Sequence, residues 1–291
     1  MSLDAIQSIL SSAVVLGSLY AIMAAGLALT WTTLGIFNFA HGALMMIGAY
    51  FAWQIGADAG FGLGVAAGMA IGVAALVGLG VVFERLVIRP FLGSRQVVLI
   101  TVITTLAAMI FIQNSALLTW GPRMKQMPPV LPQGISVMGI SFSAAELLIV
   151  IAAPVTLIAL WLFLTRTRLG TAVRAVAQNP EAAALMGLNV SRLYSLAFAV
   201  SAGLAGFSGI LLGSMRFITP TMGVEPLIKA LVVVIFGGLG SLGGTIGAAY
   251  IIGFLEATSI YFIGLYWTPA LLFLVIIVVL VIRPQGLFGK E

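Results

Sequence analysis

The side chains best suited to chemistry lie in a short stretch between two apolar runs. Asn38, Phe39, His41 and Gly42 follow Gly35 there, and His41 is the only histidine in the chain. A break of this kind can point the positive start of a new helix, which Asn38 is suited to cap, at an anionic group such as a carboxylate. A neutral histidine that is hydrogen-bonded to a neighbouring helix explains the same pattern. We take these four residues as candidates for lining a solute path.

Other polar residues also interrupt apolar sequence. Gln113 and Asn114 come late in one apolar run, where they could line a polar cavity or form hydrogen bonds between helices. Glu225 and Lys229 are four residues apart where a helix should start, a spacing that favours a local salt bridge over a substrate site. Glu256 lies within apolar sequence and is the best candidate for an ion-coupling carboxylate.

Most catalytic chemistry is excluded by what the chain lacks. It has no cysteine and a single histidine, so we expect no metal centre, no cofactor and no catalytic residues. The stretch from Gly238 to Gly243 fits the dinucleotide pattern G-x-G-x-x-G, but that pattern has meaning only between a strand and a helix. No P-loop motif occurs, so the chain cannot hydrolyse ATP through a P-loop of its own.

The composition identifies an integral membrane protein. Of 291 residues, 62% are hydrophobic and 7% are charged, with a mean hydropathy of +1.21. A soluble domain has about 25% charged residues. The apolar runs lack period-two alternation and are long enough to span a bilayer as helices. The net charge of +5 falls mainly between these runs, which excludes a nucleic-acid partner and favours a role in topology.

The chain therefore reads as a single all-α transmembrane domain over residues 1–291. We expect eight or nine crossings, because one apolar segment is too short for a comfortable full span. The predicted segments are 9–31, 36–54, 62–83, 97–119, 144–164, 190–213, 226–239, 244–263 and 267–282.

Basic residues predict the orientation. Arginines gather at 85–95 and at 166–192, and Arg283 and Lys290 lie near the C-terminus. The positive-inside rule places these three regions in the cytoplasm and the N-terminus outside. The proline-rich loop 121–134 then lies outside, although it carries two basic residues.

The segment 165–192 predicts folded helices rather than a plain connection. Asn179 suits an N-cap, Pro180 the first helical position, Glu181 the first turn and Gly187 the C′ position. We expect one helix near 171–178 and a second over 180–186. Their apolar residues need a surface to bury against, which is either the underside of the protein itself or, as we favour, a partner protein.

Four stretches of the sequence resemble the branched-chain amino acid ABC importer permeases of the LivH type. They are Arg174-Ala-Val-Ala-Gln-Asn-Pro-Glu-Ala-Ala-Ala-Leu-Met-Gly-Leu188, Gly35-Ile-Phe-Asn-Phe-Ala-His-Gly42 followed by Gly48-Ala-Tyr50, Phe236-Gly-Gly-Leu-Gly-Ser-Leu-Gly-Gly244, and Arg283-Pro-Gln-Gly-Leu-Phe288. They extend over nearly the whole chain in the order that the family shows.

The resemblance implies a permease subunit in the bacterial inner membrane. It would pair with a second, LivM-like permease, bind two cytoplasmic ATPases that hold ATP and Mg²⁺, and receive solute from a periplasmic binding protein. The solute would be a branched-chain amino acid, or a related one such as urea or a short amide. The residues expected to couple to the ATPases are Arg174, Gln178, Asn179, Pro180, Glu181, Ala182, Ala183, Met186 and Gly187.

The main alternative is a channel or an ion-coupled transporter that works without ATPases. Its coupling sites would be carboxylates inside the membrane, of which the sequence has few. ATPase docking accounts for the capped helices of 165–192, whereas ion coupling does not.

Overall fold

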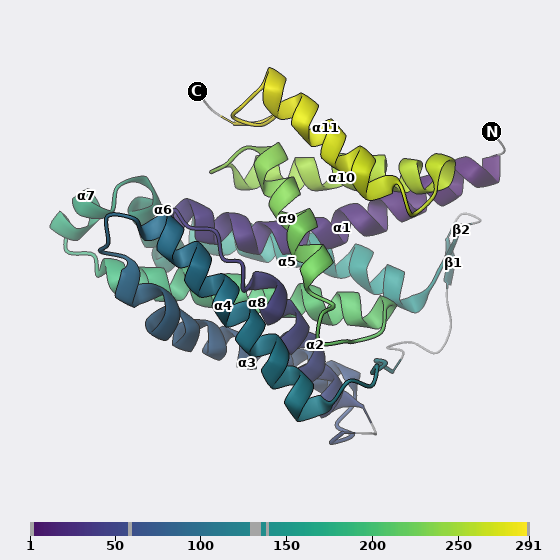
Figure 1. The fold of residues 1–291 in the computed structure, drawn as a ribbon, viewed down its shortest axis with the longest axis horizontal. Coiled ribbons are helices and arrows are strands. Elements are labelled where there is room, and N and C mark those ends of the chain that lie inside the picture. Colours follow the sequence, from purple (N-terminus) through teal and green to yellow (C-terminus); the bar gives the residue numbers. More distant parts are fainter. Residues whose placement is uncertain (1–2, 58–59, 129–134, 138–139, 290–291) are drawn as a thin grey trace.

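The computed structural model describes residues 3–57, 60–128, 135–137 and 140–289, and these form a bundle of helices with one small hairpin (Figure 1). The predicted all-α membrane bundle is confirmed. The helices are α1 (Leu3–Leu34), α2 (His41–Gly56), α3 (Val65–Phe83), α4 (Val97–Trp120), α5 (Ala144–Arg166), α6 (Arg168–Gln178), α7 (Pro180–Leu185), α8 (Val190–Met215), α9 (Val224–Gly237), α10 (Leu242–Ile263) and α11 (Thr268–Ile282).

Among the described residues, 6 helices are long and apolar enough to cross a membrane. They are α1, α3 with its continuation, α4, α5, α8 and α10. The other three predicted segments form the shorter helices α2, α9 and α11. α2 starts at His41 rather than near residue 36, because the chain between α1 and α2 is not helical.

Shorter elements complete the ends of the bundle. α3 continues into a π-helical turn, Glu84–Ile88, and a 3₁₀ turn, Arg89–Phe91. β1 (Ile135–Val137) pairs antiparallel with β2 (Ile140–Phe142) near the N-terminal end of α1 (Figure 1). Residues 129–134 of the predicted outside loop and Lys290 lie outside the described residues.

The first and second halves of the chain repeat one arrangement. In each, a long helix (α1 or α8) is followed by a non-helical stretch, a shorter helix (α2 or α9) and a further helix (α3 or α10). The halves exchange partners, since α1 packs against α10 and α8 packs against α3. α2 and α9 begin side by side inside the bundle, and α9 then crosses α1 obliquely on its way to α10 (Figure 1).

The core of this arrangement is α1. In its most apolar window, 89% of the residues are buried inside the protein, compared with 11% for α4. Ala24, Ala25 and Ala28 form a small-residue surface on α1, and Gly17 meets Gly253 of α10 backbone to backbone. Small residues let helices approach closely where lipid provides no hydrophobic drive for their association.

Candidate functional site

The segment between α5 and α8 forms the two capped helices that its sequence predicts. Oδ1 of Asn179 accepts a hydrogen bond from the Ala182 N–H at 3.0 Å, and Pro180 occupies the first helical position of α7. Gly187 has φ of 84°, the left-handed conformation that ends a helix without a steric penalty. α6 starts at Arg168, somewhat earlier than predicted, because the Thr167 side chain caps it by accepting from the Gly170 N–H.

The two helices bury one face on the protein itself and expose another. Val173, Val176 and Ala183 are buried, whereas Leu185 and Met186 at the tip of α7 are 89% and 83% exposed. The expectation that Ala183 faces a partner is therefore wrong, since its small side chain lets α7 pack on its own protein. The other expected coupling residues are exposed: Arg174, Gln178, Asn179, Pro180, Glu181, Ala182, Met186 and Gly187.

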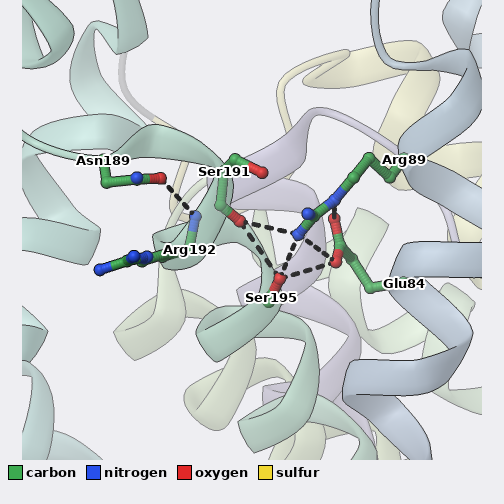
Figure 2. A network of polar contacts seen from close by, with 6 residues as sticks. All are labelled: Glu84, Arg89, Asn189, Ser191, Arg192 and Ser195. Carbon is green, nitrogen blue, oxygen red and sulfur yellow. Dashed lines mark hydrogen bonds and ion pairs between the residues drawn. The ribbon is translucent and has the colours of Figure 1, made fainter.

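An ion pair with a fully buried carboxylate lies at the end of α3 and contacts the first turns of α8, directly after this segment (Figure 2). Glu84 has 0% side-chain exposure, and Arg89 binds both of its carboxylate oxygens, Nε to Oε1 at 3.1 Å and Nη2 to Oε2 at 2.9 Å. Arg89 Nη2 also donates to Ser195 Oγ at 2.5 Å and to the Ser191 carbonyl oxygen at 3.2 Å. Ser195 in turn donates to Glu84 Oε2 at 2.7 Å.

The sequence gives no signal for this Glu84–Arg89–Ser195 cluster, because Glu84 and Ser195 are 111 residues apart. The contact between Arg89 and Glu84 is a bidentate, charge-assisted ion pair, which is stronger and more directional than a single neutral hydrogen bond. The π-helical turn at Glu84–Ile88 carries the carboxylate toward α8, and such turns are frequent at functional sites. The cluster therefore links the helix that follows α7 to a membrane span.

The predicted break before α2 is present, but Asn38 does not cap the helix. Its Oδ1 accepts from the Ala40 N–H at 3.0 Å and its carbonyl accepts from the His41 N–H, which makes a local turn. α2 then begins with no side-chain cap. The prediction of an Asn38 N-cap is wrong because the turn closes two residues too early.

His41 sits at the crossing of α1 and α2 and is fully buried. Its Nε2 is 3.2 Å from the carbonyl oxygen of Met23 in α1. Nδ1 of His41 and Nδ2 of Asn38 are buried without a hydrogen-bond partner in the part of the chain that the structure describes. Phe39 is half-buried, and its N–H donates to Oγ1 of Thr105 in α4.

The start of α2 lies against the start of α9. A β-carbon added to Gly42 would clash with the carbonyl oxygen of Gly223, and one added to Gly223 would clash with that of Gly42. Both short helices therefore begin inside the bundle and at one point, with their positive ends together. Glycine is required on both sides of this contact.

We expect the change Gly42→Leu to prevent this contact and lower the yield of folded protein. Overpacking costs about 1–3 kcal/mol in a core that can adjust, and here the obstacle is backbone. Gly78→Leu is the matched control, since an added β-carbon there meets nothing within 4 Å. Detergent-extracted protein is compared by size-exclusion profile and thermal unfolding, and equal behaviour of the two variants would contradict the expectation.

Gln113 and Asn114 are not brought to the break. Both lie on α4, a helix that the rest of the chain covers little. Asn114 is exposed and donates to the carbonyl oxygen of Ile110, one turn back on the same helix. The break and this amide pair are separate places in the fold.

A series of ion-paired side chains runs from the surface at the start of α9 into the interior of the bundle. Glu225 binds Lys229 at 2.8 Å, as its spacing predicts, and also Arg216 at 3.3 Å. Lys229 binds Glu256 of α10 at 2.7 Å, and the Tyr20 hydroxyl of α1 donates to Glu256 at 2.5 Å. Exposure falls from 58% at the Glu225 side chain to 3% at Glu256. The sequence indicates only the local pair, since Lys229 and Glu256 are 27 residues apart.

These features define a multi-pass membrane protein with a folded helical element outside its spans and paired charges within them. The chain matches the family described as "Branched-chain amino acid transport system / permease component" over residues 9–280, and it belongs to this family. The family comprises membrane subunits of ABC importers, so the chain is a transport subunit and not an enzyme.

Several curated branched-chain amino acid permeases match along nearly their whole length. The chain is 33% identical to the high-affinity branched-chain amino acid transport system permease protein LivH of Escherichia coli (strain K12), over 95% of this chain and 93% of LivH. It is 31% identical to the corresponding protein BraD of Pseudomonas aeruginosa, over 94% and 92%. A probable branched-chain amino acid permease, LivH of Methanocaldococcus jannaschii, is 29% identical over 98% and 93%. No solved structure matches the chain.

Proposed function

We propose that the chain forms part of the path for a branched-chain amino acid, and that separate ATPase subunits drive transport. The observation that carries this proposal is the α6–α7 element. Two capped helices anchor one face in the protein and present Leu185 and Met186, 89% and 83% exposed, at the tip of α7. Large apolar side chains at the end of a rigid element are suited to a docking pocket on a partner.

The proposed assembly has two cytoplasmic ATPases, a second related permease and a periplasmic binding protein. ATP and Mg²⁺ belong to the ATPases, and this chain binds neither them nor nucleic acid. Its place is the bacterial inner membrane, with the N-terminus outside and α6, α7 and the C-terminus in the cytoplasm. The arginines near α6, α7 and the end of α3 support this orientation.

Movement would pass from α7 to the spans through two connections. α6 packs against α1, α5 and α8, so it joins the coupling element to the core helix. The Glu84–Arg89–Ser195 cluster then ties the start of α8 to α3 (Figure 2). A displacement of α7 thereby reaches a helix from each half of the chain.

The solute path would run between the two permeases, close to the start of α9. The start of α9 is held from inside the bundle, because Gly42 packs directly against Gly223. The residues on that inner side are Asn38, Phe39, His41 and Gly42. Gln113 and Asn114 would line the path or face the second permease, because an exposed amide is unfavourable in lipid.

An ion-coupled carrier is less well supported. Its coupling carboxylate must exchange an ion, whereas Glu256 is held by Lys229 at 2.7 Å and by Tyr20 at 2.5 Å. A carboxylate that is neutralised by a lysine has little need of a bound cation.

The test is purification of the tagged chain from its native membrane in mild detergent, followed by mass spectrometry and reconstitution into liposomes. We expect ATPases and a second permease to accompany it, and uptake to require ATP and the binding protein. Recovery of the chain alone, moving solute without ATP, would refute the importer and favour a channel or a secondary transporter.

A further inference from the structure

An apolar cavity of about 390 Å³ lies between α9, α10 and α11. Such a volume falls within the range of about 300–1,000 Å³ that is typical of small-molecule sites. Its wall is aliphatic and aromatic, and Glu225 and Lys229 of α9 stand at one side. The apolar wall includes Ile228, Val232, Ile252, Leu272 and Ile276.

Charges of both signs are available where this cavity meets the start of α9. Glu225 lies between Lys229 at 2.8 Å and Arg216 at 3.3 Å. The side chains of Glu225 and Arg216 are 58% and 54% exposed, so a ligand can reach them. The N-terminus of α9 adds the positive end of a helix dipole beside them.

These charges lead from the outer end of the bundle toward its interior, since Arg216 follows the end of the span α8 and Ile218 pairs with Lys125 of the loop expected outside. α9 starts beside Gly42, in the interior of the bundle. Lys229 binds Glu256 of the span α10, and its ammonium group lies over the Tyr20 ring of the span α1. Charged side chains inside a membrane face a bundle interior or a water-filled cavity rather than lipid. Lys229 binds both the exposed Glu225 and the buried Glu256, so it connects the polar surface at Glu225 and Arg216 with the interior of the bundle.

We propose that this cavity is a binding site for an aliphatic α-amino acid during its passage, an inference that rests on the proposed function. The ligand's ammonium group pairs with Glu225, and its carboxylate pairs with Arg216 and the start of α9. Its side chain enters the apolar cavity between Val232 and Ile276. The ion pair between Glu225 and Arg216 is thereby replaced by one ion pair between each of these residues and the ligand. The cavity selects for an apolar side chain.

The test compares leucine with valine in uptake by the reconstituted complex, with one binding protein throughout. Val232→Phe fills the cavity and lowers leucine uptake relative to valine by about tenfold, the discrimination that one methylene gives in an apolar pocket. Ile276→Ala enlarges the cavity and shifts the ratio the other way. Glu225→Gln raises KM for both amino acids alike, because both carry the same ammonium group.

The matched control is Ile277→Phe, since Ile277 follows Ile276 but is 62% exposed and does not line the cavity. It should leave the leucine-to-valine ratio unchanged. Equal effects of Val232→Phe and Ile276→Ala on both amino acids would overturn the site. So would loss of a co-purified phospholipid from Val232→Phe with no change in the ratio, which would make the cavity an acyl-chain site. ATP-independent uptake by the unaltered complex would instead refute the proposed function itself.

Discussion

Replacement of Met186 by Glu should leave the permease folded and in the membrane but remove its ATPase subunits. Met186 is 83% exposed at the tip of α7, so the protein itself loses little when the side chain changes. In the assembled importer this side chain would be buried, and an unpaired carboxylate there is costly. We expect at least about 2 kcal/mol, or roughly 30-fold weaker association, as for other buried anchors of an interface.

The measurement is the amount of ATPase that a tagged permease retains in detergent. Met186→Leu is the matched control, because it keeps an apolar side chain of similar size at the same place, and it should retain the ATPases. Ala183→Glu would be a poor test, since Ala183 is buried within the permease and its replacement would disturb α7 itself. Full retention by Met186→Glu would show that α7 does not dock the ATPase.

Loss of Arg89 should be more harmful than loss of Arg89 together with Glu84. Arg89→Met leaves the Glu84 carboxylate at 0% exposure with only Ser195 to bind it. Breaking a buried pair in this way costs about 3–5 kcal/mol, and we expect the lower end because Arg89 itself is 37% exposed. The double change Glu84→Leu with Arg89→Met removes both charges and should recover most of this loss.

Two measurements separate stability from coupling. Thermal unfolding in detergent gives the stability of the single and double variants, with Arg85→Met, an exposed neighbour, as control. The solute transported per ATP hydrolysed then tests the link between α8 and α3. We expect the double variant to be folded yet to transport less solute per ATP, and an unchanged ratio would limit the cluster to a structural role.

The parts of the fold that depend on neighbouring residues could be predicted from the sequence. The caps of α7 at Asn179 and Gly187 are local interactions, and the structure has both. The long apolar runs gave spans with ends within a few residues of those observed, apart from α1 and α2. The Glu225–Lys229 pair was predictable for the same reason, since one helical turn brings the two together.

What depended on distant residues could not be predicted. The partners of Glu84 and Glu256 come from other helices, and no periodicity within one helix encodes them. Burial of Ala183 depends on how α7 lies against the bundle. The turn at Asn38 is a local feature, but two local turns compete there and the side chain satisfies an earlier N–H.

Because helices of the first half pack against helices of the second half, α1 cannot be fully covered until late in synthesis. α1 enters the membrane early, yet its Tyr20 contacts Glu256, which lies 236 residues further along the chain. At a synthesis rate of about 5–20 residues per second, α1 waits roughly 10–50 s before α10 exists to cover it. During that interval the surface of α1 around Gly17 and Tyr20, which α10 later covers, faces lipid or an insertion chaperone. A chain that ends before α10 would keep this surface uncovered, which would make it a substrate for membrane quality-control proteases.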